Sequence, residues 1–315
     1  MIRKAAIVSI EGSFLTNQEI IILKKEKPWG IILFRRNIVS EKQLIKLTKK
    51  IKEIMRDKKY PILIDEEGGR VSRLSNFLDN SVYSQKYFGN IYKSNKFIAT
   101  QIYKTYINSL SKILLKTGIN INTSPVLDLN KLITHKVISD RSYSNDVKIV
   151  SDLGKLCVKF YKMNKIGTVI KHIPGHGSAN LDSHFNLPKV KDSIKLLKRR
   201  DFKCFKNTRS LFAMTAHILY TNIDSKNNTT HSEIVIKKII RKEIGFKGIL
   251  ISDDISMKAL KYDLIKNAEV ALRAGCNLVL YCAGKTKETN KLLKAMPYID
   301  KFTVKKTSEF YRFLS

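Results

Sequence analysis

Eight short runs rich in β-branched residues alternate with longer amphipathic segments from one end of the sequence to the other. This alternation is typical of a parallel β-sheet whose strands are joined by crossover helices. Several of the runs are apolar nearly throughout, which indicates strands that are covered on both faces. The predicted strands span residues 6–10, 30–34, 61–65, 120–125, 168–172, 212–217, 248–253 and 277–282.

Eight strand–helix repeats in one unbroken chain predict an α/β protein built as a single (β/α)8 TIM-type barrel. An open, doubly wound sheet is the alternative. A dinucleotide-binding sheet of that kind carries a GxGxxG motif after its first strand, and none follows residues 6–10. The chain of 315 residues contains neither a low-complexity linker nor a shift in composition, so we expect one catalytic domain over residues 1–315.

Local signals delimit the predicted helices. Ser40 and Gln43 form the pattern of a capping box ahead of the apolar-periodic residues 44–51. Further helices are predicted over residues 98–116, 147–163, 193–208, 232–244 and 257–274. Helices commonly end at a left-handed glycine. Three of the predicted helices are followed by one, namely Gly118, Gly245 and Gly275.

The sequence shows no targeting or membrane-spanning segment. No apolar run reaches the ~18 residues that suggest a membrane span. The apolar stretch after Lys4 is short and is interrupted by Glu11, so we interpret it as the first barrel strand rather than a signal peptide. The four cysteines form no CxxC pair and are expected to be reduced thiols. These features predict a cytoplasmic protein with no membrane partner.

Basic residues outnumber acidic ones by 59 to 27, which gives a formal net charge of +32. One interpretation is a nucleic-acid-binding protein, because a basic surface neutralises phosphates. The lysines and arginines are instead spread over every predicted helix, and no nucleic-acid-binding motif accompanies them. A solvated, lysine-rich helix face is the usual fate of such residues. We therefore expect no nucleic-acid partner and keep a basic nucleic-acid-binding protein as a distant alternative.

Polar side chains gather where the predicted strands end. In barrels of this kind the active site forms at the carboxyl ends of the strands. Charged groups in that position are costly to desolvate unless they pair or act on a ligand. The polar segments are residues 65–70, 125–128, 171–177, His217 and 252–254.

Taken in order, these segments resemble the bacterial β-N-acetylglucosaminidases of glycoside hydrolase family 3, of the single-domain NagZ type. The resemblance covers nearly the whole chain. It rests on residues 30–37, 65–74, 124–129, 140–143, 171–177, 182–184, 216–217, 245–248 and 252–257. Four departures are mild. Tyr143 and Ile173 stand where the family usually has Phe, Ile255 where it has Leu, and Asn277 where an aspartate is common, which puts that aspartate's pairing in question.

The resemblance implies a role for eight residues. Asp253, the first aspartate of the strand-seven motif, corresponds to the nucleophile. The family's acid/base is a histidine in a loop after the fifth strand, hydrogen-bonded to an aspartate two residues before it, and these positions correspond to His184 and Asp182. The family's sugar-binding residues correspond to Asp65, Arg73, Arg141, Lys171 and His172.

These residue types suit retaining glycoside cleavage, which needs a carboxylate to attack the anomeric carbon and a group to protonate the departing oxygen. A strand end gives the nucleophile Asp253 a rigid support. In an extended loop the i, i+2 pair Asp182 and His184 has both side chains on one side. A carboxylate beside an imidazole fixes its tautomer and favours its protonated form.

The sequence therefore predicts a retaining exo-β-N-acetylglucosaminidase. The substrate implied by the resemblance is a muropeptide carrying GlcNAc-1,6-anhydroMurNAc, met in peptidoglycan recycling, and the protein is expected to be a monomer. No cofactor is implied, and no metal, because His172, His176 and His184 fit no zinc spacing. Two alternatives remain in the same family. A histidine acid/base lacks the negative charge of glutamate, so phosphate could replace water and make the enzyme a phosphorylase. The other alternative is a β-glucosidase.

Overall fold

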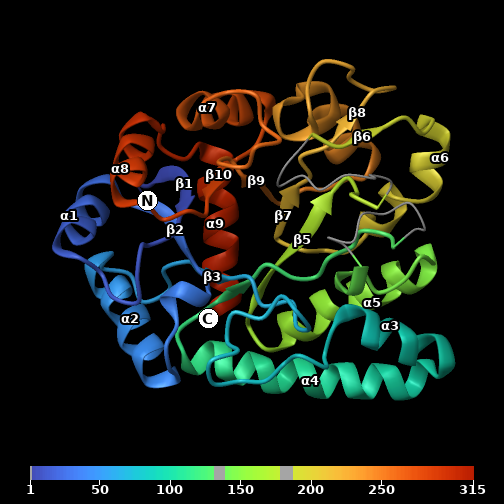
Figure 1. Cartoon of the computed structure of the whole chain (residues 1–315), viewed down its shortest axis with the longest axis horizontal. Helices are drawn as coiled ribbons and strands as arrows, with labels where there is room; N and C mark the ends of the chain where they lie inside the picture. Colours follow the sequence, from blue (N-terminus) through green and yellow to red (C-terminus); the bar gives the residue numbers. More distant parts are fainter. Residues whose placement is uncertain (1, 131–138, 178–186) are drawn as a thin grey trace.

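A computed structural model describes residues 2–130, 139–177 and 187–315. Its centre is a closed barrel of parallel strands in the order β1-β10-β9-β7-β5-β4-β3-β2 (Figure 1). Strand β1 pairs in parallel with β2 on one side and with β10 on the other, which closes the barrel. The strands are β1 Lys4–Val8, β2 Pro28–Leu33, β3 Ile62–Ile64, β4 Ile121–Asn122, β5 Gly167–Ile173, β7 Phe212–Thr215, β9 Ile249–Asp254 and β10 Leu278–Tyr281. Each overlaps one of the eight predicted runs, so the predicted (β/α)8 barrel is confirmed and the open sheet is excluded.

Helices surround the barrel on its outside (Figure 1). The helices of the described residues are α1 Asn17–Glu26, α2 Glu41–Ile54, α3 Gln85–Ser94, α4 Lys96–Lys116, α5 Val147–Met163, α6 Ile194–Arg199, the π-helical η5 Val235–Glu243, α7 Leu264–Ala274, α8 Thr286–Ala295 and α9 Lys301–Leu314. The longer helices, such as α2 and α5, bury mainly apolar residues on one face and leave the other face, often lysine-rich, in solvent.

The last helix, α9, closes the amino-terminal end of the barrel. Phe310 on α9 is completely buried and packs edge-on against Phe212 at the start of β7, with 5.2 Å between ring centroids. Thr307, one turn earlier, accepts a hydrogen bond of 2.8 Å from the indole nitrogen of Trp29 on β2. The barrel is therefore a packed core from this end inward, and a ligand can enter it from the carboxyl-terminal end.

Two predicted helices are shorter than the sequence indicated. The segment 193–208 forms only α6, and the chain then turns at Arg200 into a short 3-10 helix, η3 (Phe202–Phe205), which buries both of its phenylalanines. The segment 257–274 becomes helical only at Leu264, where the Asp263 side chain accepts a hydrogen bond from the Lys266 amide. Residues 257–263 are instead a loop at the open end of the barrel.

The predicted capping box at α2 is half formed. Ser40 Oγ accepts a hydrogen bond of 3.2 Å from the Gln43 amide, as expected. The Gln43 side-chain oxygen, however, accepts from the amide of Val39 rather than from that of Ser40. A short two-stranded sheet of β6 (Lys189–Val190) and β8 (Leu219–Tyr220), which the sequence did not indicate, lies at the barrel's edge.

No helix in residues 2–130, 139–177 and 187–315 is long and apolar enough to cross a membrane. Cys157, Cys276 and Cys282 are free thiols, as expected. Cys157, Cys204 and Cys276 are buried, and Cys282 is half-buried.

Candidate active site

A cavity of about 310 Å³ opens at the carboxyl-terminal end of the barrel. Apolar side chains, among them Phe34, Met214 and Met257, form part of its wall. The structure places six of the eight predicted site residues around this one cavity: Asp65, Arg73, Arg141, Lys171, His172 and Asp253. The other two, Asp182 and His184, lie outside the described residues.

Asp65 follows β3 and is surrounded by donors. Its Oδ2 accepts from Arg73 Nη2 at 2.6 Å, and its Oδ1 accepts from Thr123 Oγ1 at 2.7 Å and from Lys171 Nζ. Burial raises the pKa of Asp65, but Lys171 and Arg73 lower it by more, so that it lies well below its usual value. Asp65 is therefore an ionised acceptor in the wall of the cavity.

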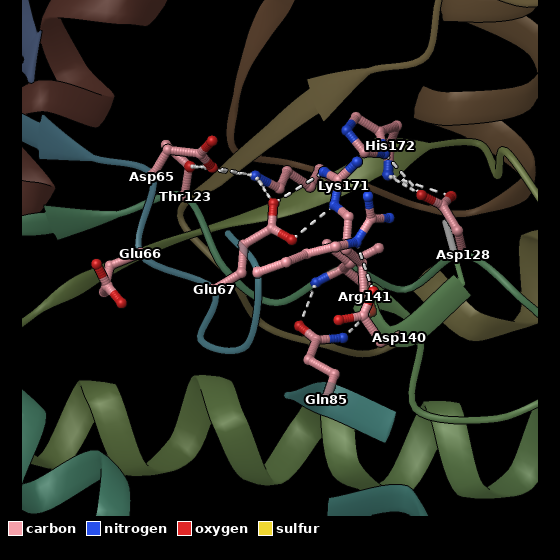
Figure 2. Close-up of polar contacts among 12 residues, drawn as sticks. Asp65, Glu66, Glu67, Gln85, Thr123, Asp128, Asp140, Arg141, Lys171 and His172 are labelled. Atoms are coloured by element: carbon pink, nitrogen blue, oxygen red, sulfur yellow. Dashed lines mark hydrogen bonds and ion pairs between the residues drawn. The ribbon is translucent and has the colours of Figure 1, made fainter. Parts of the chain in front are cut away.

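Lys171, on β5, lies between two carboxylates (Figure 2). Its Nζ forms ion pairs with Asp65 and with Glu67 Oε1, the latter at 2.6 Å, and its side chain is only 3% exposed. Burial lowers the pKa of Lys171, and the two carboxylates raise it by more. The ammonium group thus remains charged although it is almost completely removed from water.

Arg141 ends the short 3-10 helix η2 (Ser139–Arg141) and binds Glu67 through two parallel hydrogen bonds. Its Nε and Nη2 are each 2.8 Å from a carboxylate oxygen of Glu67 (Figure 2). Burial raises the pKa of Glu67, but Arg141 and Lys171 lower it by more. Arg141, which the resemblance places among the sugar-binding residues, lines the cavity and is at the same time bound to Glu67.

His172 is turned toward Asp128, a carboxylate with no exposed surface (Figure 2). His172 Nδ1 lies 2.6 Å from Asp128 Oδ2, and the backbone amide of His176 donates to Asp128 Oδ1 at 2.6 Å. Burial raises the pKa of Asp128, but His172 and His176 lower it by more, so the carboxylate is ionised. An ionised carboxylate only accepts hydrogen bonds, so Nδ1 of His172 carries a proton and the ring orientation is fixed.

Asp253 lies at the carboxyl end of β9, half-buried, with its side chain lining the cavity. Burial raises the pKa of Asp253, but His217, His172, the Asp254 amide and Lys171 together lower it below its usual value. The neighbouring Asp254 is engaged differently, because its carboxylate accepts from the amide and hydroxyl of Ser256 and from the Cys282 amide. The Asp253 carboxylate, by contrast, is ionised and, among the described residues, accepts one hydrogen bond, from the Asp254 amide, so most of its acceptor capacity remains available to a ligand.

Sequence reasoning did not single out several side chains that hold this site together. Glu67 compensates Lys171 and Arg141, Asp128 orients His172, and Thr123 donates to Asp65. Glu67 and Asp128 both belong to polar strand-end segments, and that position was the available signal. His176 is buried, which lowers its pKa to about 4. Among the described residues, no group of three or more His, Cys, Asp or Glu side chains is arranged to hold a metal ion.

Residues 7–306 match the family model described as the glycosyl hydrolase family 3 N terminal domain. The chain belongs to glycosyl hydrolase family 3. It is therefore a glycoside hydrolase, and the resemblance expected from its sequence is confirmed. One relative, the beta-hexosaminidase of Psychromonas ingrahamii, is 30% identical over 98% of this chain and 89% of its own length.

Solved structures of family 3 enzymes share the fold closely. NagZ from Neisseria gonorrhoeae, solved in complex with N-trifluoroacetyl-D-glucosamine, is 28% identical and has a TM-score of 0.88. The match covers 100% of this chain and 90% of that one. A family 3 β-N-acetylglucosaminidase from Paenibacillus is 25% identical with a TM-score of 0.86, and this chain spans 60% of its length. The single barrel thus corresponds to nearly all of the Neisseria protein and to a part of the longer one.

Proposed function

We propose that this family 3 glycoside hydrolase is a retaining exo-β-N-acetylglucosaminidase with Asp253 as its nucleophile. The observation that carries the proposal is the ionised strand-end carboxylate of Asp253, which shares one cavity with the sugar-binding candidates Asp65, Arg73 and Lys171. The names of the similar proteins support the choice of sugar, because they are beta-hexosaminidases and β-N-acetylglucosaminidases.

In this mechanism the terminal sugar occupies the cavity and Asp253 attacks its anomeric carbon. The bond from the anomeric carbon to the leaving oxygen breaks, and a covalent glycosyl ester forms on Asp253. Water then displaces the carboxylate from the sugar, with net retention of configuration. The lowered pKa of Asp253 suits this role, because the attacking group has to be ionised. A cavity of about 310 Å³, at the small end of ligand pockets, suits one terminal sugar ring and hence exo action.

In this proposal the buried charged side chains of the cavity bind the hydroxyl groups of the sugar. Asp65 is acceptor-only and takes hydrogen bonds from sugar hydroxyls, whereas Lys171 and Arg73 are donors next to it. His172 presents a ring whose orientation Asp128 has already fixed. Arg141 contributes chiefly through Glu67, which keeps Lys171 in place between two carboxylates. Because these groups are paired before the sugar arrives, little ordering entropy is lost on binding.

We assign the acid/base role to His184, with Asp182 orienting its imidazole. This assignment rests on the motif and its spacing from Lys171 in the sequence. In the first step the imidazolium protonates the departing oxygen, and in the second the neutral imidazole removes a proton from the attacking water.

The substrate we propose is a muropeptide that carries GlcNAc-1,6-anhydroMurNAc, cleaved in the cytoplasm during peptidoglycan recycling. Buried, unpaired Cys157 and Cys276 suit a reducing compartment. We further propose that the catalytic domain comprises residues 1–315 and acts as a monomer without a cofactor.

The test of the proposal compares Asp253→Ala with Asp254→Asn, a change at the next residue that lies outside the proposed chemistry. On an aryl β-N-acetylglucosaminide we expect kcat to fall at least ~10⁴-fold in Asp253→Ala, because covalent catalysis is lost. Asp254→Asn should keep far more activity. A fluorinated GlcNAc inactivator should label Asp253, as shown by peptide mass, and the first sugar released should be the β-anomer. Normal turnover by Asp253→Ala, or release of the α-anomer, would refute the mechanism.

The same assay separates the alternatives. Accumulation of a sugar 1-phosphate when phosphate is added would identify a phosphorylase. Faster turnover of the aryl glucoside than of the aryl N-acetylglucosaminide would identify a β-glucosidase. If His184 is the acid/base, His184→Ala should lose activity on substrates with poor leaving groups and keep it on substrates with good ones.

A further inference from the structure

A continuous chain of hydrogen bonds runs beneath the proposed nucleophile, from the Asp253 amide to the Asp254 carbonyl. The Asp253 amide donates to Thr215 Oγ1 at 3.3 Å, and that hydroxyl lies 2.8 Å from Thr230 Oγ1. Thr230 Oγ1 in turn lies 2.7 Å from His217 Nδ1, and His217 Nε2 lies 3.0 Å from the carbonyl oxygen of Asp254. The three side chains have no exposed surface. We call Thr215, Thr230 and His217 the relay.

The two ends of the relay fix the direction of its outer bonds. An amide N–H can only donate and a carbonyl oxygen can only accept, so Thr215 Oγ1 accepts from the Asp253 amide and His217 Nε2–H donates to Asp254. Between these ends, one arrangement uses both threonine protons inside the relay: Thr215 donates to Thr230, and Thr230 donates to His217 Nδ1. In that arrangement the proton of the His217 ring that takes part in the relay is on Nε2 and not on Nδ1.

The relay lies where the barrel's own hydrogen bonds stop. The ladder between β7 and β9 pairs Phe212 with Ile249 and ends at Met214 with Ile251. Asp253 and Asp254 lie beyond that ladder, so on this side the β9 backbone has the relay in place of a neighbouring strand. A purely structural buried network could attach anywhere along the strand, whereas this one attaches to the amide of Asp253 and to the carbonyl of the next residue, Asp254.

The segment that contains the relay residue Thr230 is fixed by further hydrogen bonds. Thr230 belongs to the short 3-10 helix η4 (Thr229–His231), whose Thr229 amide donates to the Ile218 carbonyl at 2.8 Å. Asn228 caps η4 by accepting from the His231 amide. The relay thus connects the nucleophile strand to an anchored segment.

We infer that His217, Thr230 and Thr215 are positioning residues that hold the Asp253 backbone at the distance the attack on the anomeric carbon requires. The inference rests on the proposed role of Asp253. A displacement of a reacting group by about 1 Å can cost roughly 100-fold in rate, and the Asp65 side of the cavity does not depend on the relay. Loss of the relay should therefore lower kcat and leave sugar affinity in place.

The kinetic test compares Thr230→Val, which has nearly the same shape but no hydroxyl, with Thr230→Ser, which keeps it. On an aryl β-N-acetylglucosaminide we expect Thr230→Val to lower kcat roughly 10- to 100-fold. The dissociation constant for GlcNAc should change by less than about twofold, and Thr230→Ser should recover most of kcat. Thr303→Val is the matched control, because the Thr303 hydroxyl is buried on α9 with no partner among the described residues. It should keep wild-type kcat.

A second measurement does not depend on turnover. In protein labelled with 15N-histidine, the imidazole signal of His217, assigned by its absence in His217→Gln, should report a proton on Nε2 and none on Nδ1. Thr230→Val should shift that signal, and Thr303→Val should leave it unchanged.

A proton on Nδ1 of His217 would overturn the relay. Wild-type turnover by Thr230→Val, or a loss of kcat matched by a loss of GlcNAc affinity, would overturn the positioning role while the proposed function stands. A wild-type protein that cleaves no N-acetylglucosaminide would overturn the proposed function and the positioning role together, and the imidazole signal would still decide the relay.

Discussion

Lys171 and Glu67 form an ion pair of 2.6 Å in which neither side chain is more than 3% exposed. Such a pair contributes little net stability by itself, because both charges lose their hydration. Removal of one partner alone is strongly destabilising, because the other charge stays buried without compensation. Glu67 faces two cations, Lys171 and Arg141, so its charge is the one on which this cluster depends most.

We predict that Glu67→Gln lowers the free energy of unfolding by about 3 kcal/mol, the cost of breaking a buried pair. The change keeps the size of the side chain and removes only its charge. Chemical denaturation at pH 7 measures the effect. Glu233→Gln is the matched control, because its ion pair with Lys237 is more than half exposed and should contribute less than about 0.5 kcal/mol. A loss as small as that of the control would contradict the importance given to Glu67.

The same pair predicts an acid dependence of stability. The pKa of Glu67 is lower in the folded protein than in the unfolded chain, because Arg141 and Lys171 outweigh the effect of burial. The unfolded chain therefore binds the proton first as the pH falls, and stability is lost on acidification. The advantage of wild type over Glu67→Gln should be complete above about pH 5 and shrink below about pH 4. Chemical denaturation of both proteins at pH 7, 5, 4 and 3 measures this difference in stability. A difference that grew toward pH 3 would contradict the lowered pKa of Glu67.

The sequence alone predicts which elements meet at the site. Asp65, Lys171 and Asp253 are more than 80 positions apart, yet each ends a run of strand-forming residues. The carboxyl ends of barrel strands converge, and the structure places all three side chains around one cavity.

The pairing within the site could not be predicted, because beyond a strand's end the alternation of side chains no longer applies. Glu66 and Glu67 follow Asp65 directly, and only the path of the loop decides which carboxylate points inward. Gly68 has a φ of 83°, in the left-handed region, and turns the chain there. Glu66 consequently accepts from the amides of Arg73 and Leu74, while Glu67 reaches Lys171.

The start of α7 shows the same limit for secondary structure. The segment from Met257 to Ala274 has helical periodicity, which led to the prediction of one helix. Asp263 caps the helix six residues later, and Met257 lines the cavity instead. An aspartate inside an apolar-periodic segment is compatible with either arrangement, so tertiary contacts decide.

Asp128 offers a test of the orientation of His172. In Asp128→Asn the amide keeps one acceptor oxygen and turns an NH2 group toward the other donor, either His172 Nδ1 or the His176 amide. Loss of one charge-assisted hydrogen bond should lower kcat/KM roughly 10- to 100-fold. Steady-state kinetics measures this, with Asp79→Asn on the surface as the control. An unchanged kcat/KM would mean that the ring does not need Asp128.

Asn277 stands where an aspartate is common in the family, and its contacts show what the replacement of aspartate by asparagine changes. Its Oδ1 accepts from Arg241 Nη2 and from the Leu250 amide, each at 2.8 Å. Burial lowers the pKa of Arg241, so the cation would gain from a carboxylate at this position. The acceptor geometry suits both residues, and only the charge is missing from this chain.

We therefore predict that Asn277→Asp raises the free energy of unfolding by about 1 kcal/mol at pH 7, because the hydrogen bond from the Arg241 cation becomes an ion pair and the Leu250 amide then donates to a charged oxygen. The gain should disappear toward pH 3, where the new carboxyl group is protonated. Asn277→Leu, which removes the acceptor, should be destabilised at both pH values. Activity should not change, because residue 277 precedes β10 at the end of the barrel opposite the cavity. A less stable Asn277→Asp at pH 7 would show that the Arg241 environment does not accept a second charge.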